Sequence, residues 1–104
     1  MKPKLIRDKI PEIIKKNGNN PITIQVTGVE LFEALKQKLV EEALEVQEAT
    51  NYDELKAELA DVLEIVTTLI ETEKLDWDEI IEIREDKART RGRFKKGYIL
   101  KQVE

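Results

Sequence analysis

The chain has 104 residues, of which 40% are hydrophobic and 38% are charged, and its formal net charge is -4. This length predicts one domain over residues 1–104, and the acidic balance argues against a nucleic-acid polymer as partner. Cysteine and histidine are absent; this excludes disulfides, histidine triads and the usual zinc ligands, and leaves carboxylates, lysine, tyrosine or metal-bound water for acid–base chemistry.

Four helices are predicted from apolar periodicity and from the residues that begin and end helices. Their expected ranges are about 8–16, 28–49, 52–73 and 77–90. The expected N-caps are Asp8, Thr27, Asn51 and Asp76, and the last three each have a glutamate three positions on. Asn17-Gly18 and Gly92 are expected to end the first and fourth helices.

Two short strands are also predicted. Residues 22–26 alternate and are rich in β-branched side chains, which favours a strand. Residues 98–103 have a similar character, and the two segments are expected to pair because a single strand leaves its backbone groups unsatisfied. The expected fold is therefore all-α with a small two-stranded β element.

Acidic residues recur at helical spacing in the second and third helices. The pattern is Glu41-Glu42-x-x-Glu45, then Glu58-x-x-Asp61. Residues three apart share a helix face, and the short linker between the helices predicts an antiparallel hairpin that gathers four carboxylates. Two carboxylates ~4 Å apart repel by ~4 kcal/mol at an effective dielectric of ~20, so such a group would need a cation.

Carboxylate oxygens are the ligands that Mg²⁺ and Mn²⁺ prefer. The expected cation is therefore Mg²⁺, with Mn²⁺ as a possible substitute. Glu42 interrupts the apolar stripe of its helix, whereas an acid on a solvated face would lie opposite the stripe. The alternative is that these acids are ordinary surface residues of a highly charged chain.

Basic residues gather near the end of the fourth helix and beyond it. They are expected to bind substrate phosphates, since arginine and lysine both suit phosphate oxygens. The alternative is that they complement the dipole of the helix, which accounts for residues inside the helix but not for those beyond it. The predicted phosphate-binding residues are Lys38, Lys87, Arg91, Arg93, Lys95 and Lys96.

Three charged residues near the chain start, Arg7, Asp8 and Lys9, are interpreted as a structural cluster around a helix cap, although they could also reach the site. No apolar run approaches the ~18 residues of a membrane span and no signal peptide is visible, so a cytoplasmic protein without membrane contact is expected.

The two acidic motifs resemble the signature of the MazG-like all-α nucleotide pyrophosphohydrolases, which include phosphoribosyl-ATP pyrophosphohydrolase and the dimeric dUTPases. The opening Lys4-Leu5-Ile6-Arg7-Asp8-Lys9-Ile10-Pro11 and the closing Arg91-Gly92-Arg93-Phe94 look like those of small single-domain members of the phosphoribosyl-ATP-pyrophosphohydrolase-like branch. The closing motif departs from relatives, which often have a second glycine where this chain has Arg93.

The resemblance implies Mg²⁺-dependent hydrolysis of a nucleoside triphosphate to a monophosphate and pyrophosphate. It implies Glu42, Glu45, Glu58 and Asp61 as metal ligands, with Glu41 as a helper; Glu41 and Glu42 are the candidates for activating water. Two alternatives stay open: phosphoribosyl-ATP hydrolysis in histidine synthesis, and a helical dimer module without catalytic activity.

Assembly is predicted from the same helices. Their apolar residues cover more than the ~100° stripe that one neighbouring helix can bury, and exposed apolar patches usually mark interfaces. We therefore expect two hairpins to form a four-helix bundle across a homodimer or within a homotetramer, as family resemblance also implies.

Overall fold

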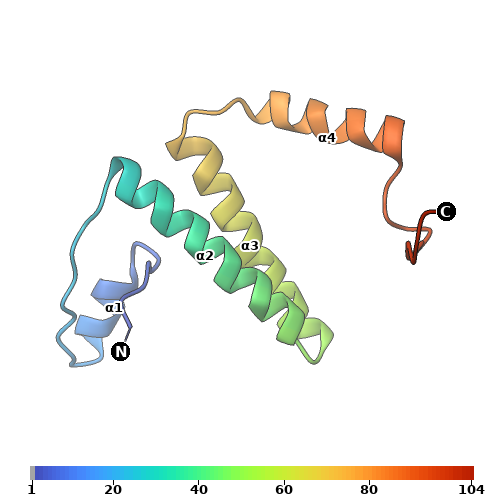
Figure 1. Cartoon of the computed structure of the whole chain (residues 1–104). Coiled ribbons are helices and arrows are strands. Elements are labelled where there is room, and N and C mark those ends of the chain that lie inside the picture. Colours follow the sequence, from blue (N-terminus) through green and yellow to red (C-terminus); the bar gives the residue numbers. More distant parts are fainter. Residues whose placement is uncertain (1) are drawn as a thin grey trace. The chain divides into compact units, whose positions relative to one another are not determined.

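This computed structural model describes residues 2–104. Within this range the chain forms four α-helices and no β-strand (Figure 1). The helices are α1 (Ile10–Lys16), α2 (Gly28–Glu48), α3 (Tyr52–Thr72) and α4 (Trp77–Arg91). The predicted all-α class is confirmed, and each helix boundary lies within two residues of its expected position. None of these helices has the combination of length and apolar content that would let it span a bilayer.

Side-chain caps fix the starts of the two later helices. The Asn51 side chain accepts a hydrogen bond from the backbone N–H of Glu54 at 2.9 Å. The Asp76 side chain accepts one from the backbone N–H of Asp78, also at 2.9 Å. Each bond satisfies an N–H group that has no partner within its helix, as the sequence predicts.

One predicted cap is wrong, and a second lies at the predicted position but lacks the predicted side-chain hydrogen bond. Lys9, not Asp8, is the N-cap of α1, because a backbone hydrogen bond from Ile10 to Arg7 closes a turn ahead of the helix and places Asp8 inside that turn. Thr27 is the N-cap of α2, but its side chain makes no capping hydrogen bond. A capping residue type in the right position therefore does not ensure the bond.

The predicted β element is also wrong. Neither 22–26 nor 98–103 forms a strand. Ile22 and Ile24 are 95% and 88% exposed, so the alternating pattern does not serve to bury one face. Water can satisfy the backbone of such exposed segments, and β propensity has little effect without a neighbouring strand to pack against.

The core of the first part of the chain is an antiparallel hairpin of α2 and α3 (Figure 1). Leu35 from α2 and Ile70 from α3 are its buried apolar side chains. Contacts divide the chain into two units, the first ending at Glu73 and the second covering Lys74–Glu104. The acidic hairpin lies wholly in the first unit, and the predicted bundle across a dimer stays a prediction.

Replacing Leu35 with alanine should destabilise the protein by about 2–5 kcal/mol, because Leu35 is only 2% exposed and its loss would leave a cavity between the helices. Denaturant unfolding measures this cost. The control is Ile22→Ala in the extended segment, which should change stability by less than about 0.5 kcal/mol. Equal costs for the two variants would contradict this description of the core.

Candidate metal centre

Four carboxylates meet at the middle of the hairpin. Glu42 and Glu45 lie one turn apart on α2, and Glu58 and Asp61 lie one turn apart on α3. One carboxylate oxygen from each residue lies within 4.8 Å of those from the other three. The structure therefore brings together the four acids that the sequence selected, which we call the acidic cluster.

Glu42 is the most deeply placed member of the acidic cluster. The residue is 6% exposed, and its Oε2 atom is buried without a hydrogen-bond partner. The Oε2 atom of Glu58 is buried and unpartnered in the same way. Leaving a buried carboxylate oxygen unpartnered costs about 1–3 kcal/mol or more, so these two atoms point to a ligand that satisfies them.

Burial and crowding make the carboxylates of α2 harder to ionise. Burial is the main cause that raises the pKa of Glu42, and the neighbouring Glu45 carboxyl raises it further. Contact with the Glu58 carboxyl is the main cause that raises the pKa of Glu45. Lys38 opposes both shifts but does not cancel them. In the metal-free protein, Lys38 thus compensates only part of the repulsion among these carboxylates.

The donor set fits a hard divalent cation. All four donors are carboxylates, which suit Mg²⁺ or Mn²⁺, and two of them offer unpartnered oxygens turned inward. Residues 42, 45, 58 and 61 would hold the ion. The chemistry of these side chains does not distinguish Mg²⁺ from Mn²⁺.

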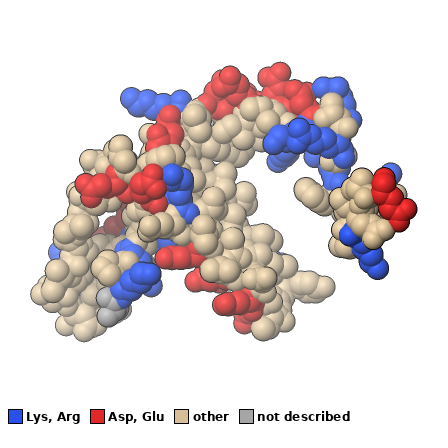
Figure 2. Space-filling view, viewed as in Figure 1, with Lys and Arg blue, Asp and Glu red and all other residues tan. Residues whose placement is uncertain are grey.

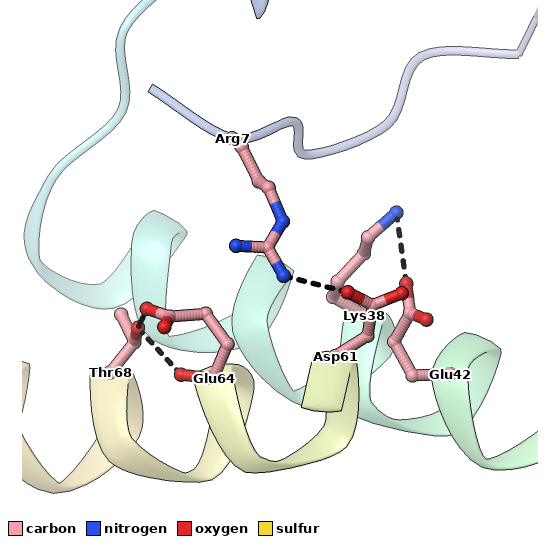
Figure 3. Close-up of polar contacts among 6 residues, drawn as sticks. All are labelled: Arg7, Lys38, Glu42, Asp61, Glu64 and Thr68. Atoms are coloured by element: carbon pink, nitrogen blue, oxygen red, sulfur yellow. Dashed lines mark hydrogen bonds and ion pairs between the residues drawn. The ribbon is translucent and has the colours of Figure 1, made fainter. Parts of the chain in front are cut away.

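Lys38 and Glu41 lie beside the acidic cluster. The Nζ atom of Lys38 is 3.4 Å from Oε2 of Glu41 and 3.6 Å from Oε1 of Glu42 (Figure 3 draws the second contact). The Glu41 side chain is 51% exposed and is not a member of the cluster. Lys38 is therefore a counter-charge for two carboxylates on its own helix.

Arg7 contacts the acidic cluster, although the sequence interpretation treated it as structural. Its Nη2 atom donates a hydrogen bond to Oδ1 of Asp61 at 2.6 Å, across 54 positions in the chain (Figure 3). That hydrogen bond is the main cause that raises the pKa of Arg7, so the side chain stays charged. The opening motif that resembles family members was the sequence signal that could have indicated this role.

The other predicted phosphate-binding residues belong to the second unit. Figure 2 shows the basic side chains of α4 along its lower side and at its C-terminal end, with acidic side chains along its upper edge. Arg93 donates a hydrogen bond to Glu85 at 2.7 Å, and this contact lowers the pKa of Glu85. Contact between these basic residues and a phosphate stays a prediction. The residues concerned are Lys87, Arg91, Arg93, Lys95 and Lys96.

A helical hairpin that gathers two pairs of carboxylates is the arrangement that the sequence resemblance to MazG-like proteins led us to expect. The family profile for phosphoribosyl-ATP pyrophosphohydrolase matches residues 9–88. The chain therefore belongs to the phosphoribosyl-ATP pyrophosphohydrolase family of the MazG-like superfamily. Membership supports a hydrolase that acts on a nucleotide.

The chain is also similar to part of one curated protein. A protein of Mycolicibacterium smegmatis, described only as uncharacterized, is 39% identical over 49 residues, which cover 47% of this chain and 50% of that protein. The chain thus spans about half the length of the curated relative it matches. No solved structure matches the chain.

Glu42→Gln should raise the melting temperature of the metal-free protein, and the gain should be larger at pH 8 than at pH 5. The pKa of Glu42 is raised on folding, so the folded state binds its proton more tightly than the unfolded state does. Its contribution therefore becomes unfavourable as pH rises above the ordinary value of 4.5. A gain of about 1 kcal/mol corresponds to ~4–8 °C.

Calorimetry in a chelating buffer at the two pH values would measure this effect. Glu41→Gln is the matched control, because it makes the same change at the adjacent, exposed position. A destabilised Glu42→Gln protein at pH 8 would show that the carboxylate is compensated within the chain.

Proposed function

We propose that this chain is a divalent-cation-dependent nucleoside triphosphate pyrophosphohydrolase that releases pyrophosphate and a nucleoside monophosphate in nucleotide house-cleaning. The observation that carries the proposal is the acidic cluster, with its two buried and unpartnered carboxylate oxygens on Glu42 and Glu58. Membership of the phosphoribosyl-ATP pyrophosphohydrolase family supports the same reaction type.

In the proposed reaction, the residues of the hairpin have different roles. Members of the acidic cluster hold the cation, which supplies positive charge to the phosphates and makes water a better nucleophile. Glu41 is exposed beside the cluster and is suited to take the proton of the attacking water. Lys38, within 4 Å of Glu41 and Glu42, helps to hold both carboxylates in place.

The proposed reaction is a direct displacement. Water attacks the α-phosphorus, the bond from that phosphorus to the bridging oxygen breaks, and pyrophosphate leaves with the bond's electron pair. Cationic side chains balance the charge that develops on the leaving group. The candidates for this role are Lys38, Lys87, Arg91, Arg93, Lys95 and Lys96. No covalent intermediate is needed, which agrees with a chain that lacks cysteine and histidine.

Phosphoribosyl-ATP is the second candidate substrate, and it is favoured by the family to which the chain belongs, phosphoribosyl-ATP pyrophosphohydrolase. Its hydrolysis would use the same carboxylates and would differ only in the pocket for the ribosyl-phosphate. The proposed cytoplasmic location suits either substrate. A helical dimer module without activity is a weaker candidate, because competent acids fill all four cluster positions.

Activity on a panel of substrates tests the proposal. Canonical and damaged nucleoside triphosphates and phosphoribosyl-ATP are incubated with the protein and Mg²⁺, and pyrophosphate release is measured. At least one should be hydrolysed, and Glu42→Gln or Asp61→Asn should reduce the rate about 100-fold or more, since loss of a ligand affects both metal affinity and turnover.

Glu33→Gln is the control for these variants, because Glu33 is an exposed acid of the same helix that pairs with Lys36. It should keep wild-type activity. Near wild-type, Mg²⁺-dependent turnover in both cluster variants would rule out the proposed metal ligands, and no hydrolysis across the panel would favour the inactive module.

We also propose that the active form is a homodimer or homotetramer in which hairpins share a four-helix core. The support is that both long helices carry exposed apolar side chains: Val40 and Leu44 on α2, and Leu59 and Leu63 on α3. Members of each pair are four residues apart and share a helix face. The single copy leaves these faces uncovered, and closed twofold dimers are the commonest solution.

Light scattering at micromolar concentration tests this assembly. The expected mass is two or four times the 12.1 kDa of one chain. Leu63→Glu should shift the mass distribution toward smaller species, because it places a charge in an apolar contact. A fully active monomer would contradict the proposed assembly.

A further inference from the structure

Arg7 reaches the acidic cluster from outside the hairpin. It lies in the segment before α1, whereas all four acids lie on α2 and α3. Figure 3 shows its side chain extending toward α3, with the guanidinium on Asp61. A residue of the first turns of the chain is thereby placed next to a carboxylate that is a proposed metal ligand.

The guanidinium keeps donors available for another partner. Among the described residues, Asp61 is the one hydrogen-bond acceptor that Arg7 contacts, through a single Nη2 atom. A guanidinium has five N–H donors in a planar fork that matches phosphate oxygens. The Arg7 side chain is 60% exposed, so the remaining donors can be reached by a ligand that arrives from solvent.

Lys38 does not offer the same capacity. Its side chain is 20% exposed, and its ammonium already lies between the carboxylates of Glu41 and Glu42. The two cations therefore differ: Lys38 already contacts two carboxylates and has less capacity left for a ligand, whereas Arg7 contacts one carboxylate and is more exposed.

Stability alone does not account for the Arg7–Asp61 pair. The two side chains are 60% and 37% exposed, and ion pairs this accessible to water contribute little to stability. Meanwhile the pair occupies an oxygen of a residue whose carboxylate belongs to the cluster. In the absence of nucleotide, Arg7 thus competes with a cation for Asp61.

We propose that Arg7 is a phosphate-binding residue of the site, which pairs with Asp61 only until the metal and nucleotide are bound and then donates to a phosphate oxygen of the substrate. This inference rests on the proposed pyrophosphohydrolase function. It assigns Arg7 two opposite effects: it weakens the binding of a bare cation and strengthens the binding of the nucleotide.

Opposite effects give a test that a structural role does not pass. Mn²⁺ alone is titrated into metal-free protein by calorimetry, and KM and kcat are measured for whichever panel substrate the wild type hydrolyses. In Arg7→Gln, Mn²⁺ should bind about 3–10-fold more tightly, since one positive charge beside the cluster is removed. KM should rise about 10–100-fold, since a charged hydrogen bond to phosphate is lost.

Two further variants separate charge from geometry. Arg7→Lys keeps the charge but not the forked donors, so its Mn²⁺ affinity should stay near the wild-type value while its KM is restored only in part. Arg89→Gln is the matched control: it removes one arginine that pairs with an exposed carboxylate, Asp86, on α4. It should leave Mn²⁺ affinity, KM and kcat unchanged.

The outcomes distinguish this inference from the function on which it rests. A wild-type protein that binds no Mn²⁺ and hydrolyses no substrate overturns both. A wild-type protein that does both, with Arg7→Gln moving Mn²⁺ affinity and KM in the same unfavourable direction or not at all, overturns only the role of Arg7. A lower melting temperature of Arg7→Gln, together with weaker binding of both Mn²⁺ and substrate, would show that Arg7 only stabilises the fold.

Discussion

Repulsion among four carboxylates is the constraint on which the rest of the hairpin depends. Helical spacing puts the acids in two pairs, and the antiparallel turn between α2 and α3 sets the pairs opposite each other with ligand atoms within 4.8 Å. Buried apolar side chains, Leu35 on α2 and Ile70 on α3, help to hold the helices together elsewhere along their length. The folded hairpin therefore contains carboxylates whose negative charge is not fully neutralised by the cationic side chains around them.

The cations around the cluster compensate only part of it. Arg7 reaches Asp61, and Lys38 lies beside Glu42, but Oε2 of Glu42 and of Glu58 keep no partner. These two contacts therefore leave the buried oxygens of Glu42 and Glu58 available to the cation that we propose. Membership of the phosphoribosyl-ATP pyrophosphohydrolase family supports our proposal that this cation acts on a polyphosphate substrate.

Local sequence signals predicted the helices and the acidic cluster, whereas contacts distant in sequence were missed. The acidic spacing and the short linker suffice to place Glu42 near Asp61. Helical geometry puts residues three apart on one face, and the short linker sets the two faces side by side. The Arg7–Asp61 contact spans 54 positions, and no local periodicity encodes it. Alternation in 22–26 indicates a suitable strand face but does not supply the neighbouring strand, which is why that prediction was wrong.

We infer that the buried oxygens of Glu42 and Glu58 bind a divalent cation. The most direct measurement is the melting temperature of chelator-treated protein as Mg²⁺ is added at constant ionic strength. Binding to the folded state alone raises stability by RT ln(1 + [Mg²⁺]/Kd). We expect the melting temperature of the wild type to rise continuously with Mg²⁺ and that of Glu42→Gln to stay constant. An unchanged melting temperature, or an equal rise in both proteins, would contradict it.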